Sequence, residues 1–168
     1  GDMMGDHHHW RKTYAYEGSA RIPFIVAPPP NQRGRVKQGV VDEVGEIQDI
    51  MPTILAACGL ELPEHLQGQS LLPILPGERT ALERSWSFIE TPESSGGDDL
   101  TEIGIRTPSH LYGMCLDAQN HELVDTDFCF YDLVCDPYEF DNLVGTNRAP
   151  GLESELKQRL LEWHEQTG

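Results

Sequence analysis

The sequence predicts an α/β chain in which a small antiparallel sheet is packed by a C-terminal helix. Residues 84–137 contain short apolar runs typical of strands, and residues 151–166 repeat leucine at helical spacing. Earlier in the chain, one apolar run and one helical pattern indicate the edge of something larger. We therefore expect residues 1–83 to be the end of a large α/β domain, and residues 84–168 to be a C-terminal subdomain.

The first half contains one predicted strand and one predicted helix. Residues 22–28, IPFIVAP, are rich in β-branched and aromatic side chains, which suits a buried strand. Residues 48–60 predict a helix: Asp49 is a good N-cap, Pro52 falls in the first turn, and Gly59 ends it. Its apolar face would hold Ile50, Ile54, Leu55 and Cys58. Prolines and glycines make residues 62–78 a loop with one short helical turn.

The second half reads as strands followed by a helix. RSWSFIET, residues 84–91, is a strand, and PESSGGDD, residues 92–99, is a flexible loop. Residues 102–117 predict a hairpin that turns near TPSH, and residues 122–137 add a strand and then a turn. Residues 151–166 predict the closing helix, whose apolar stripe comprises Leu152, Leu156, Leu160 and Trp163.

The chain is strongly acidic: 12 Lys and Arg against 28 Asp and Glu give a formal net charge of −16. Such a surface repels nucleic acid and anionic membranes, and no apolar run approaches the length of a membrane span. We therefore expect neither nucleic acid nor a membrane as a partner. The start is neither a signal peptide nor a Met, so the sequence reads as cut from a longer chain and the compartment stays open.

The four cysteines match no zinc-binding spacing. We expect Cys58, Cys115, Cys129 and Cys135 to be buried free thiols, with a bridge between Cys129 and Cys135 left as an alternative.

Three stretches, in family order, resemble the sulfatase family of the alkaline-phosphatase-like superfamily. The first is GDHHHWRKTYAYEGSARIPFIV, with its Lys, aromatic-Glu-Gly-Ser, Arg and Pro. The second is DIMPTILAACGLELPEHLQGQSLLPIL, a helix followed by a G-x-S-L-x-P loop. The third is FYDLVCDPYEFDNLVG, similar to the family turn YDL-x-x-DP-x-E-x-x-NL. The resemblance implies a sulfatase fold whose catalytic domain ends in residues 1–83.

The resemblance implies hydrolysis of aryl or carbohydrate sulfate esters. The family nucleophile is a formylglycine made from a C/S-x-P-x-R motif, beside a divalent cation, usually Ca²⁺, held by carboxylates. This sequence contains no such motif, because CDPYE at Cys135 has Glu139 where Arg belongs. The family's metal carboxylates would lie just before Gly1. We therefore expect this chain to be a C-terminal fragment without metal ligands, inactive alone and without a tight calcium site.

Lys12 is the first candidate for a catalytic residue. The resemblance implies that this lysine contacts the sulfate and helps stabilise the leaving oxygen, as a compact ammonium can at a desolvated site. The alternative is an ordinary solvated surface lysine.

The histidine triplet follows the same segment. His7 matches a family position near the active site, where it would bind substrate or transfer a proton, and a structural role in the loop is equally open. His9 is a candidate for substrate binding, and an exposed or rim position is the alternative for His8 and His9. A metal site of all three is not expected, because adjacent loop residues rarely converge on one ion. Their place in a family-matching segment also argues against a purification tag.

Four further residues complete the predicted site. We expect Glu17 and Arg21 to be structural, with Glu17 orienting the Lys12 loop or Arg21 pairing with a buried carboxylate. Tyr16 would line the substrate rim or simply pack, and His110 would overhang the pocket from the hairpin. The DPYE turn, Asp136 to Glu139, would join the last strand to the final helix.

Two other functions stay open. One is a phosphodiesterase or phosphonate monoester hydrolase of the same superfamily, and the other is a non-catalytic binding module. We also expect an apolar surface to be exposed around residues 22–28 and the helix that follows Asp49, through which the chain could associate with itself.

Overall fold

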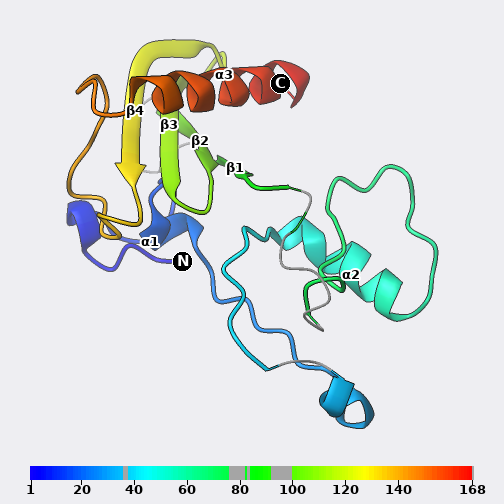
Figure 1. Cartoon of the computed structure of the whole chain (residues 1–168). Coiled ribbons are helices and arrows are strands. Elements are labelled where there is room, and N and C mark those ends of the chain that lie inside the picture. The colour runs from blue at the N-terminus through cyan, green and yellow to red at the C-terminus, as the bar shows by residue number, and fades with distance from the viewer. Residues whose placement is uncertain (36–37, 76–81, 83, 92–99, 168) are drawn as a thin grey trace. The chain divides into compact units, whose positions relative to one another are not determined.

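The structure, a computed structural model, describes residues 1–35, 38–75, 82, 84–91 and 100–167 (Figure 1). Two compact units make up the chain, residues 1–23 with 88–168, and residues 24–87. The N-terminal segment thus belongs with the sheet and not with residues 24–87, which differs from a division at residue 83. Where the domain boundary lies in a complete sulfatase fold stays a prediction.

The first unit is built on a four-stranded sheet in the order β1-β2-β3-β4. The strands are β1 (Ser87–Glu90), β2 (Leu100–Arg106), β3 (His110–Asp117) and β4 (Leu123–Asp132). β3 pairs antiparallel with both β2 and β4, so the predicted hairpin and the strand after it are confirmed. The predicted loop at residues 92–99 lies outside the described residues.

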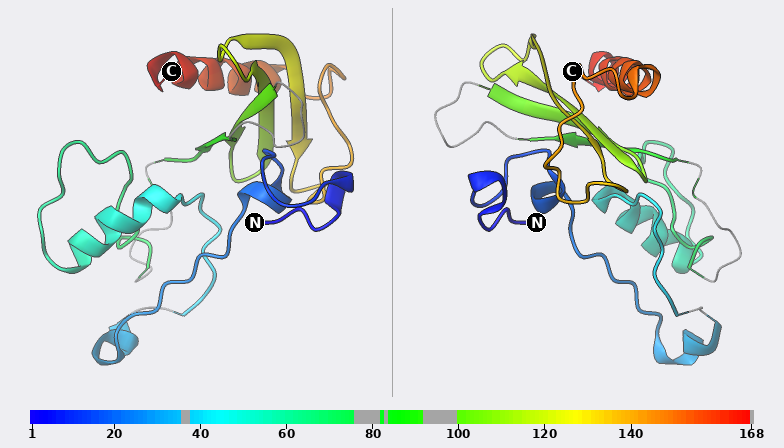
Figure 2. Two further views of the ribbon diagram at one scale, coloured as in Figure 1. Left: turned by 180° about the vertical axis from the view of Figure 1, so that it is seen from behind. Right: turned by 60° about the vertical axis from the view of Figure 1, so that its left-hand side comes forward.

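The C-terminal helix α3 (Pro150–Thr167) packs across one face of this sheet, as Figures 1 and 2 show. Leu156 and Leu160 of the predicted stripe are buried. Trp163 stacks on Phe88 of β1, with ring centroids 4.7 Å apart. The predicted α/β class, with an antiparallel sheet and a closing helix, is therefore confirmed.

The N-terminal segment contributes to the core of the same unit. It contains the short helices η1 (Asp6–His8) and α1 (Glu17–Ala20). Met3 and Tyr16 lie in one buried cluster with Leu111, Cys129 and Tyr131 of β3 and β4. Ala15 packs on Gly104 of β2, where a Cβ would come within 3.4 Å of the Ala15 Cβ. The loop that carries Lys12 is thereby attached to the end of the sheet.

The predicted strand at residues 22–28 is wrong: this stretch has no regular structure, and Ile25 is 87% exposed. A strand requires a neighbouring strand to pair its backbone N–H and C=O groups, and none pairs with this run among the described residues. The expected apolar exposure is confirmed instead, since Ile22, Phe24 and Val26 are exposed as well.

The second unit is organised by η3 (Ile47–Asp49) and α2 (Ile50–Ala57), while η2 (Pro30–Arg35) lies apart in the sequence. The predicted helix is confirmed, with Asp49 at the N-cap and Gly59 after its end at a φ of +69°. Glu46 and Asp49 form a capping box around η3. Its predicted apolar face stays largely exposed, at Ile50 and Ile54. No helix in the described ranges is both long and apolar enough to cross a bilayer.

The prediction for the cysteines is correct for two of the four. Cys115 and Cys129 are buried in the sheet, whereas Cys58 and Cys135 are exposed. Cys58 is the C-cap of α2 and Cys135 lies in the turn after β4, outside the buried centre of the sheet. All four are free thiols, so the alternative Cys129–Cys135 bridge is not formed.

Candidate functional site

The Lys12 segment is a loop closed on itself by backbone hydrogen bonds. Met3 N donates to Arg11 O at 2.7 Å, and Gly5 N donates to His9 O at 2.9 Å. The Asp2 carboxylate accepts from Met4 N and Arg11 N at 3.0 and 3.2 Å. These bonds fix the shape of the loop up to the residue before Lys12.

Five non-glycine residues of this loop adopt a left-handed backbone. The φ angles are +49° at Met4, +50° at His7, +65° at His8, +70° at Arg11 and +97° at Thr13. Such conformations cost free energy for side chains with a Cβ, and they persist where surrounding contacts over-determine them. A concentration of them in one loop is typical of functional sites.

Lys12 lies between two of these strained residues, with its side chain exposed. Its ammonium makes neither a hydrogen bond nor an ion pair with any residue in the described part of the chain. A lysine on a braced loop, with no carboxylate on it, can bind an anionic group of another molecule.

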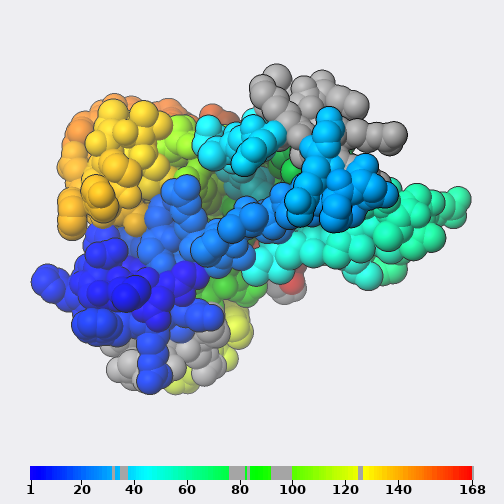
Figure 3. All heavy atoms as spheres, turned by 90° about the horizontal axis from the view of Figure 1, so that it is seen from below, coloured from blue at the N-terminus to red at the C-terminus, as the bar shows by residue number. Residues whose placement is uncertain are grey.

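His7 is held from several sides. Its ring stacks on Tyr16, with centroids 4.2 Å apart and an interplanar angle of 6°, and Phe140 lies at 5.8 Å. Its Nε2 is hydrogen-bonded to the backbone oxygen of Tyr138 at 3.2 Å. Figure 3 shows the N-terminal segment (blue) beside the loop that follows β4 (yellow to orange) on one face. These contacts provide the structural role, and a catalytic role for His7 stays a prediction.

The other two histidines of the triplet lie differently. His9 is half-buried and stacks on Tyr14, with centroids 4.0 Å apart, whereas His8 is exposed. No three His, Cys, Asp or Glu side chains group closely enough to hold a metal ion within the described ranges. Where calcium would bind in the complete protein stays a prediction.

Glu17, at the start of α1, is bound by an arginine that sequence reasoning missed. Arg106 of β2 donates from Nε to Oε1 at 2.9 Å and from Nη2 to Oε2 at 3.1 Å. Arg21 is largely exposed and reaches the same carboxylate at 3.7 Å. Of the two expected arrangements, Arg21 does pair with a mostly buried carboxylate, but Arg106 makes the stronger contact.

Two acids, the half-buried Glu102 and the buried Glu139, also support the loop. Glu102 of β2 accepts a hydrogen bond from Ala15 N at 2.7 Å. Glu139 accepts from Glu17 N with both oxygens, at 3.1 and 3.0 Å. Burial raises the pKa of each carboxyl from 4.5 to about 7, although these backbone bonds oppose the shift. The sequence analysis identified Glu139 as the acid of the DPYE turn. It did not predict that Glu139 binds the distant Glu17 amide.

Tyr16 and His110 lie in packed positions. Tyr16 belongs to the buried cluster, and burial raises the pKa of its hydroxyl, which fits the packing alternative. His110 starts β3; its Nδ1 is hydrogen-bonded to Ser109 Oγ at 2.8 Å and its ring faces Phe130. The expected role of either residue in substrate binding stays a prediction.

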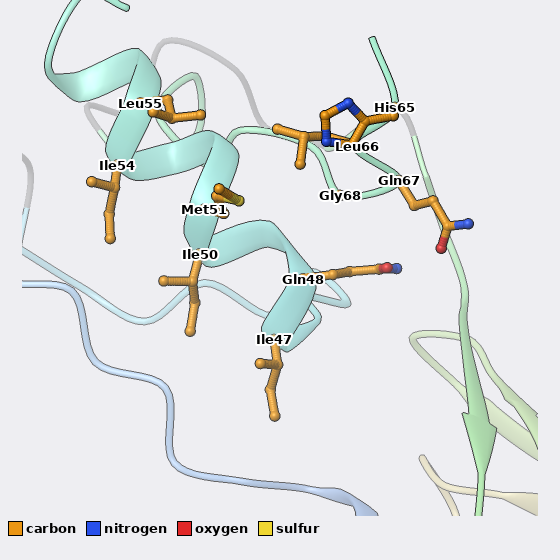
Figure 4. Close-up of a pocket in the computed structure, with 10 residues that line it drawn as sticks. All are labelled: Ile47, Gln48, Ile50, Met51, Ile54, Leu55, His65, Leu66, Gln67 and Gly68. Atoms are coloured by element: carbon orange, nitrogen blue, oxygen red, sulfur yellow. The ribbon is translucent and has the colours of Figure 1, made fainter. Parts of the chain in front are cut away.

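The second unit contains an open pocket of about 660 Å³ between α2 and the loop at residues 65–68 (Figure 4). Met51 and Leu55 point towards the loop, while Ile47, Ile50 and Ile54 point to the other side of the helix. The lining is apolar apart from two glutamines and His65, so it holds no pair of groups for acid–base chemistry.

Over almost its whole length, the chain matches the C-terminal part of a family of sulfatases. The family model described as N-sulphoglucosamine sulphohydrolase, C-terminal, matches residues 5–166, and the chain belongs to this family. The resemblance inferred from the three stretches is thus confirmed.

Curated relatives carry several names. An arylsulfatase of Clostridium perfringens is 36% identical over 96% of this chain and 31% of its own length. The multifunctional alkaline phosphatase superfamily protein PehA of Trinickia caryophylli is 28% identical over 97% of this chain and 32% of its own. The chain spans about a third of the length of these relatives.

Solved structures share the fold. The structure of BT4656 in complex with its substrate D-glucosamine-2-N,6-O-disulfate has a TM-score of 0.75 and 27% identity, over 99% of this chain and 32% of that one. The phosphonate monoester hydrolase SpPMH of Silicibacter pomeroyi has a TM-score of 0.69 and 25% identity, over 100% of this chain and 33% of that one.

Proposed function

We propose that this chain forms the C-terminal part of a sulfatase that hydrolyses aryl or carbohydrate sulfate esters. The observation that carries the proposal is the Lys12 loop. Its exposed ammonium pairs with none of the described residues, and the chain matches the sulfatase C-terminal family from residue 5 to residue 166. An N-acetylglucosamine-6-O-sulfatase of Bacteroides thetaiotaomicron, 29% identical over 99% of this chain, supports the carbohydrate alternative.

In the net reaction proposed, one water is consumed and the S–O bond to the alcohol breaks. The alcohol oxygen takes up a proton, and the sulfuryl group leaves as hydrogen sulfate. Negative charge develops on that oxygen as the bond breaks. The ammonium of Lys12 donates a hydrogen bond to it, which stabilises the transition state more than the bound ester. Because the chain carries a net charge of −16, a local cation is also needed to attract an anionic ester.

Only the resemblance to the sulfatase family implies which nucleophile and which metal the complete enzyme would use. A formylglycine would supply the attacking oxygen and calcium would neutralise charge on the sulfuryl group. The sequence given contains no C/S-x-P-x-R motif, and its described residues contain no cluster of three His, Cys, Asp or Glu side chains. Metal analysis and peptide mass spectrometry of the full-length gene product test both. Calorimetry with calcium on residues 1–168 alone tests the expectation that this part has no tight site.

A second candidate is a phosphonate monoester hydrolase or phosphodiesterase. The likeness to SpPMH, over the whole of this chain, supports it. The non-catalytic binding module has less support, because a free-standing module needs no unpaired lysine on a strained loop.

Turnover by the full-length gene product separates these candidates. We expect 4-nitrophenyl sulfate to be hydrolysed with a higher kcat/KM than 4-nitrophenyl phenylphosphonate. Lys12→Ala should lower kcat about 100-fold or more, whereas Lys157→Ala, in the surface ion pair with Asp127, is the matched control and should leave kcat unchanged. A preference for the phosphonate would contradict the sulfatase proposal, and no turnover of either ester would favour the binding module.

A further inference from the structure

The turn after β4 touches the Lys12 loop at two places, one on each side of the lysine. On the N-terminal side, the backbone oxygen of Tyr138 is hydrogen-bonded to His7 Nε2, and Phe140 lies against the His7 ring. On the C-terminal side, the Glu139 carboxylate accepts from Glu17 N. His7 precedes Lys12 by five residues and Glu17 follows it by five.

The Glu139 side chain is unusual for a turn residue. It is only 3% exposed, and burial of an acid costs free energy unless its oxygens are bonded. Its backbone has a φ of +61°, a conformation in which glycine would be unstrained. The hydrogen bonds that the carboxylate accepts from the Glu17 amide offset the cost of burial, and the bond from Glu139 N to Asp136 O, 3.1 Å long, supports the backbone.

A purely local role for this acid does not fit the hydrogen bonds. Other acids hold the turn together: Asp136 accepts from Asp141 N at 2.7 Å, and Asp132 accepts from the amides of Val134 and Cys135. Glu139 makes no such bond within the turn among the described residues. Its carboxylate instead accepts a hydrogen bond from Glu17 N, which is 122 residues away in the sequence.

We propose that Glu139 is a positioning residue for Lys12. Its carboxylate holds the loop at Glu17, and the carbonyl of Tyr138 holds it at His7. Each contact is five residues from Lys12. The conformation of the loop then depends on a turn near the other end of the sequence. The effect on catalysis rests on the hydrolase function proposed above, whereas the fixing of the loop does not.

The test uses the full-length gene product and three variants. Glu139→Gly removes the carboxylate and suits the left-handed backbone, so it separates the side chain from strain. Glu139→Gln keeps one oxygen acceptor, so its hydrogen exchange and its kcat should lie between those of the wild type and those of Glu139→Gly. Asp141→Asn is the matched control. Asp141 follows Glu139 by two residues, and its carboxylate forms an exposed ion pair with Arg148.

Two readouts are expected to change together. In Glu139→Gly, amide hydrogen exchange in peptides covering residues 5–20 should be about tenfold faster or more, while Asp141→Asn should match the wild type. kcat on the better ester should fall about 10- to 100-fold with a smaller change in KM, because a displaced catalytic group affects the transition state most. In a Lys12→Ala background, Glu139→Gly should cause little further loss of kcat.

Each arm has an outcome that overturns part of the proposal. Unchanged exchange in Glu139→Gly would show that the carboxylate does not hold the loop. Faster exchange with unchanged kcat, or an equal loss of kcat in the Lys12→Ala background, would show that it does not act through Lys12. If the wild type hydrolyses neither ester, the proposed function fails, and the exchange measurement still decides whether Glu139 holds the loop.

Discussion

Arg106 of β2 and Glu17 of α1 are joined by two parallel hydrogen bonds, 2.9 and 3.1 Å long, across 89 residues of sequence. Both side chains are mostly buried, at 19% and 15% exposure. A planar guanidinium matches a carboxylate in this two-point geometry, which an ammonium cannot reproduce. The pair therefore ties the segment that carries Lys12 to the central hairpin.

Arg106→Ala should destabilise the chain. It leaves the Glu17 carboxylate with Arg21 alone, at 3.7 Å and largely in solvent. We expect a loss of about 2–3 kcal/mol, because a mostly buried carboxylate loses its main partner. Urea unfolding of Arg106→Ala and Arg106→Lys measures it, and the lysine variant should recover only part. An unchanged midpoint for both variants would show that the pair contributes nothing.

Asp49 should contribute to the stability of the second unit about as much as Arg106 contributes to that of the first. Its fully buried carboxylate accepts from Glu46 N and Gln69 N, and Arg84 Nη2 lies 2.6 Å from Oδ2. Asp49→Asn leaves Arg84 with Glu46, 2.9 Å away, as its one carboxylate partner among the described residues, so we expect a loss of about 2–3 kcal/mol. The exposed Asp42→Asn is the control and should be neutral in the same urea titration. Equal midpoints for the two variants would contradict this prediction.

The sheet, its hairpin and the closing helix could be predicted because their patterns are local. Alternation of apolar side chains identifies a strand, and leucines three or four apart identify a helix face, wherever the partner lies. The strand expected at residues 22–28 failed for the opposite reason. Apolar composition indicates burial, but strand geometry depends on a neighbouring backbone that these residues do not supply.

For the candidate site, the sequence predicted the loop but not its supports. Lys12, His7 and Glu17 stood out because their segment resembles a stretch of the sulfatase family. Arg106, Glu102 and Glu139 act from positions 87 to 122 residues away from their partners, and nothing in a single sequence pairs them. Arg106 and Glu102 could have been noticed only as charged residues within a predicted strand, where side chains facing the core are usually apolar. Glu139 stood in a turn, where an acid is usually exposed.

The stability of the chain should fall as the pH rises from about 5 to about 8. Burial raises the pKa of Glu102 and Glu139 from 4.5 to about 7, so between these values the folded chain binds more protons than the unfolded chain. The neighbouring Glu17 and Asp136 raise the pKa of Glu139 further, while Arg106 opposes them. For Glu139 alone the loss amounts to about 3 kcal/mol across this range.

Urea midpoints at pH 5 and pH 8 measure this dependence. Glu139→Gln cannot ionise, so its midpoint should change less with pH than that of the wild type. Asp141→Asn, which removes an exposed acid from the same turn, should keep the full dependence. A dependence that is the same in all three proteins would mean that Glu139 does not titrate differently on folding.

Two of the four thiols should react in the native chain. Cys58 and Cys135 are exposed, whereas Cys115 and Cys129 are buried. Burial raises the pKa of Cys115 to about 11 and that of Cys129 well above its usual value, so neither supplies the reactive thiolate. A chromogenic disulfide reagent should titrate two thiols natively and four in urea. Four native thiols would show that the sheet opens readily.

The exposed face of α2 should promote association of residues 1–168 in isolation. Ile47 of η3 and Ile50 and Ile54 of α2 lie on one side of this helical segment (Figure 4), and Ile47 and Ile54 are 67% and 57% exposed. Contiguous apolar surface of this kind gains free energy when a second molecule covers it. Sedimentation velocity should detect oligomers that increase with concentration, and Ile54→Glu should reduce them. Lys157→Glu changes the charge by more, but on the helix α3 of the first unit, and should not reduce them. A chain that stays monomeric at all concentrations would show that this face does not drive association.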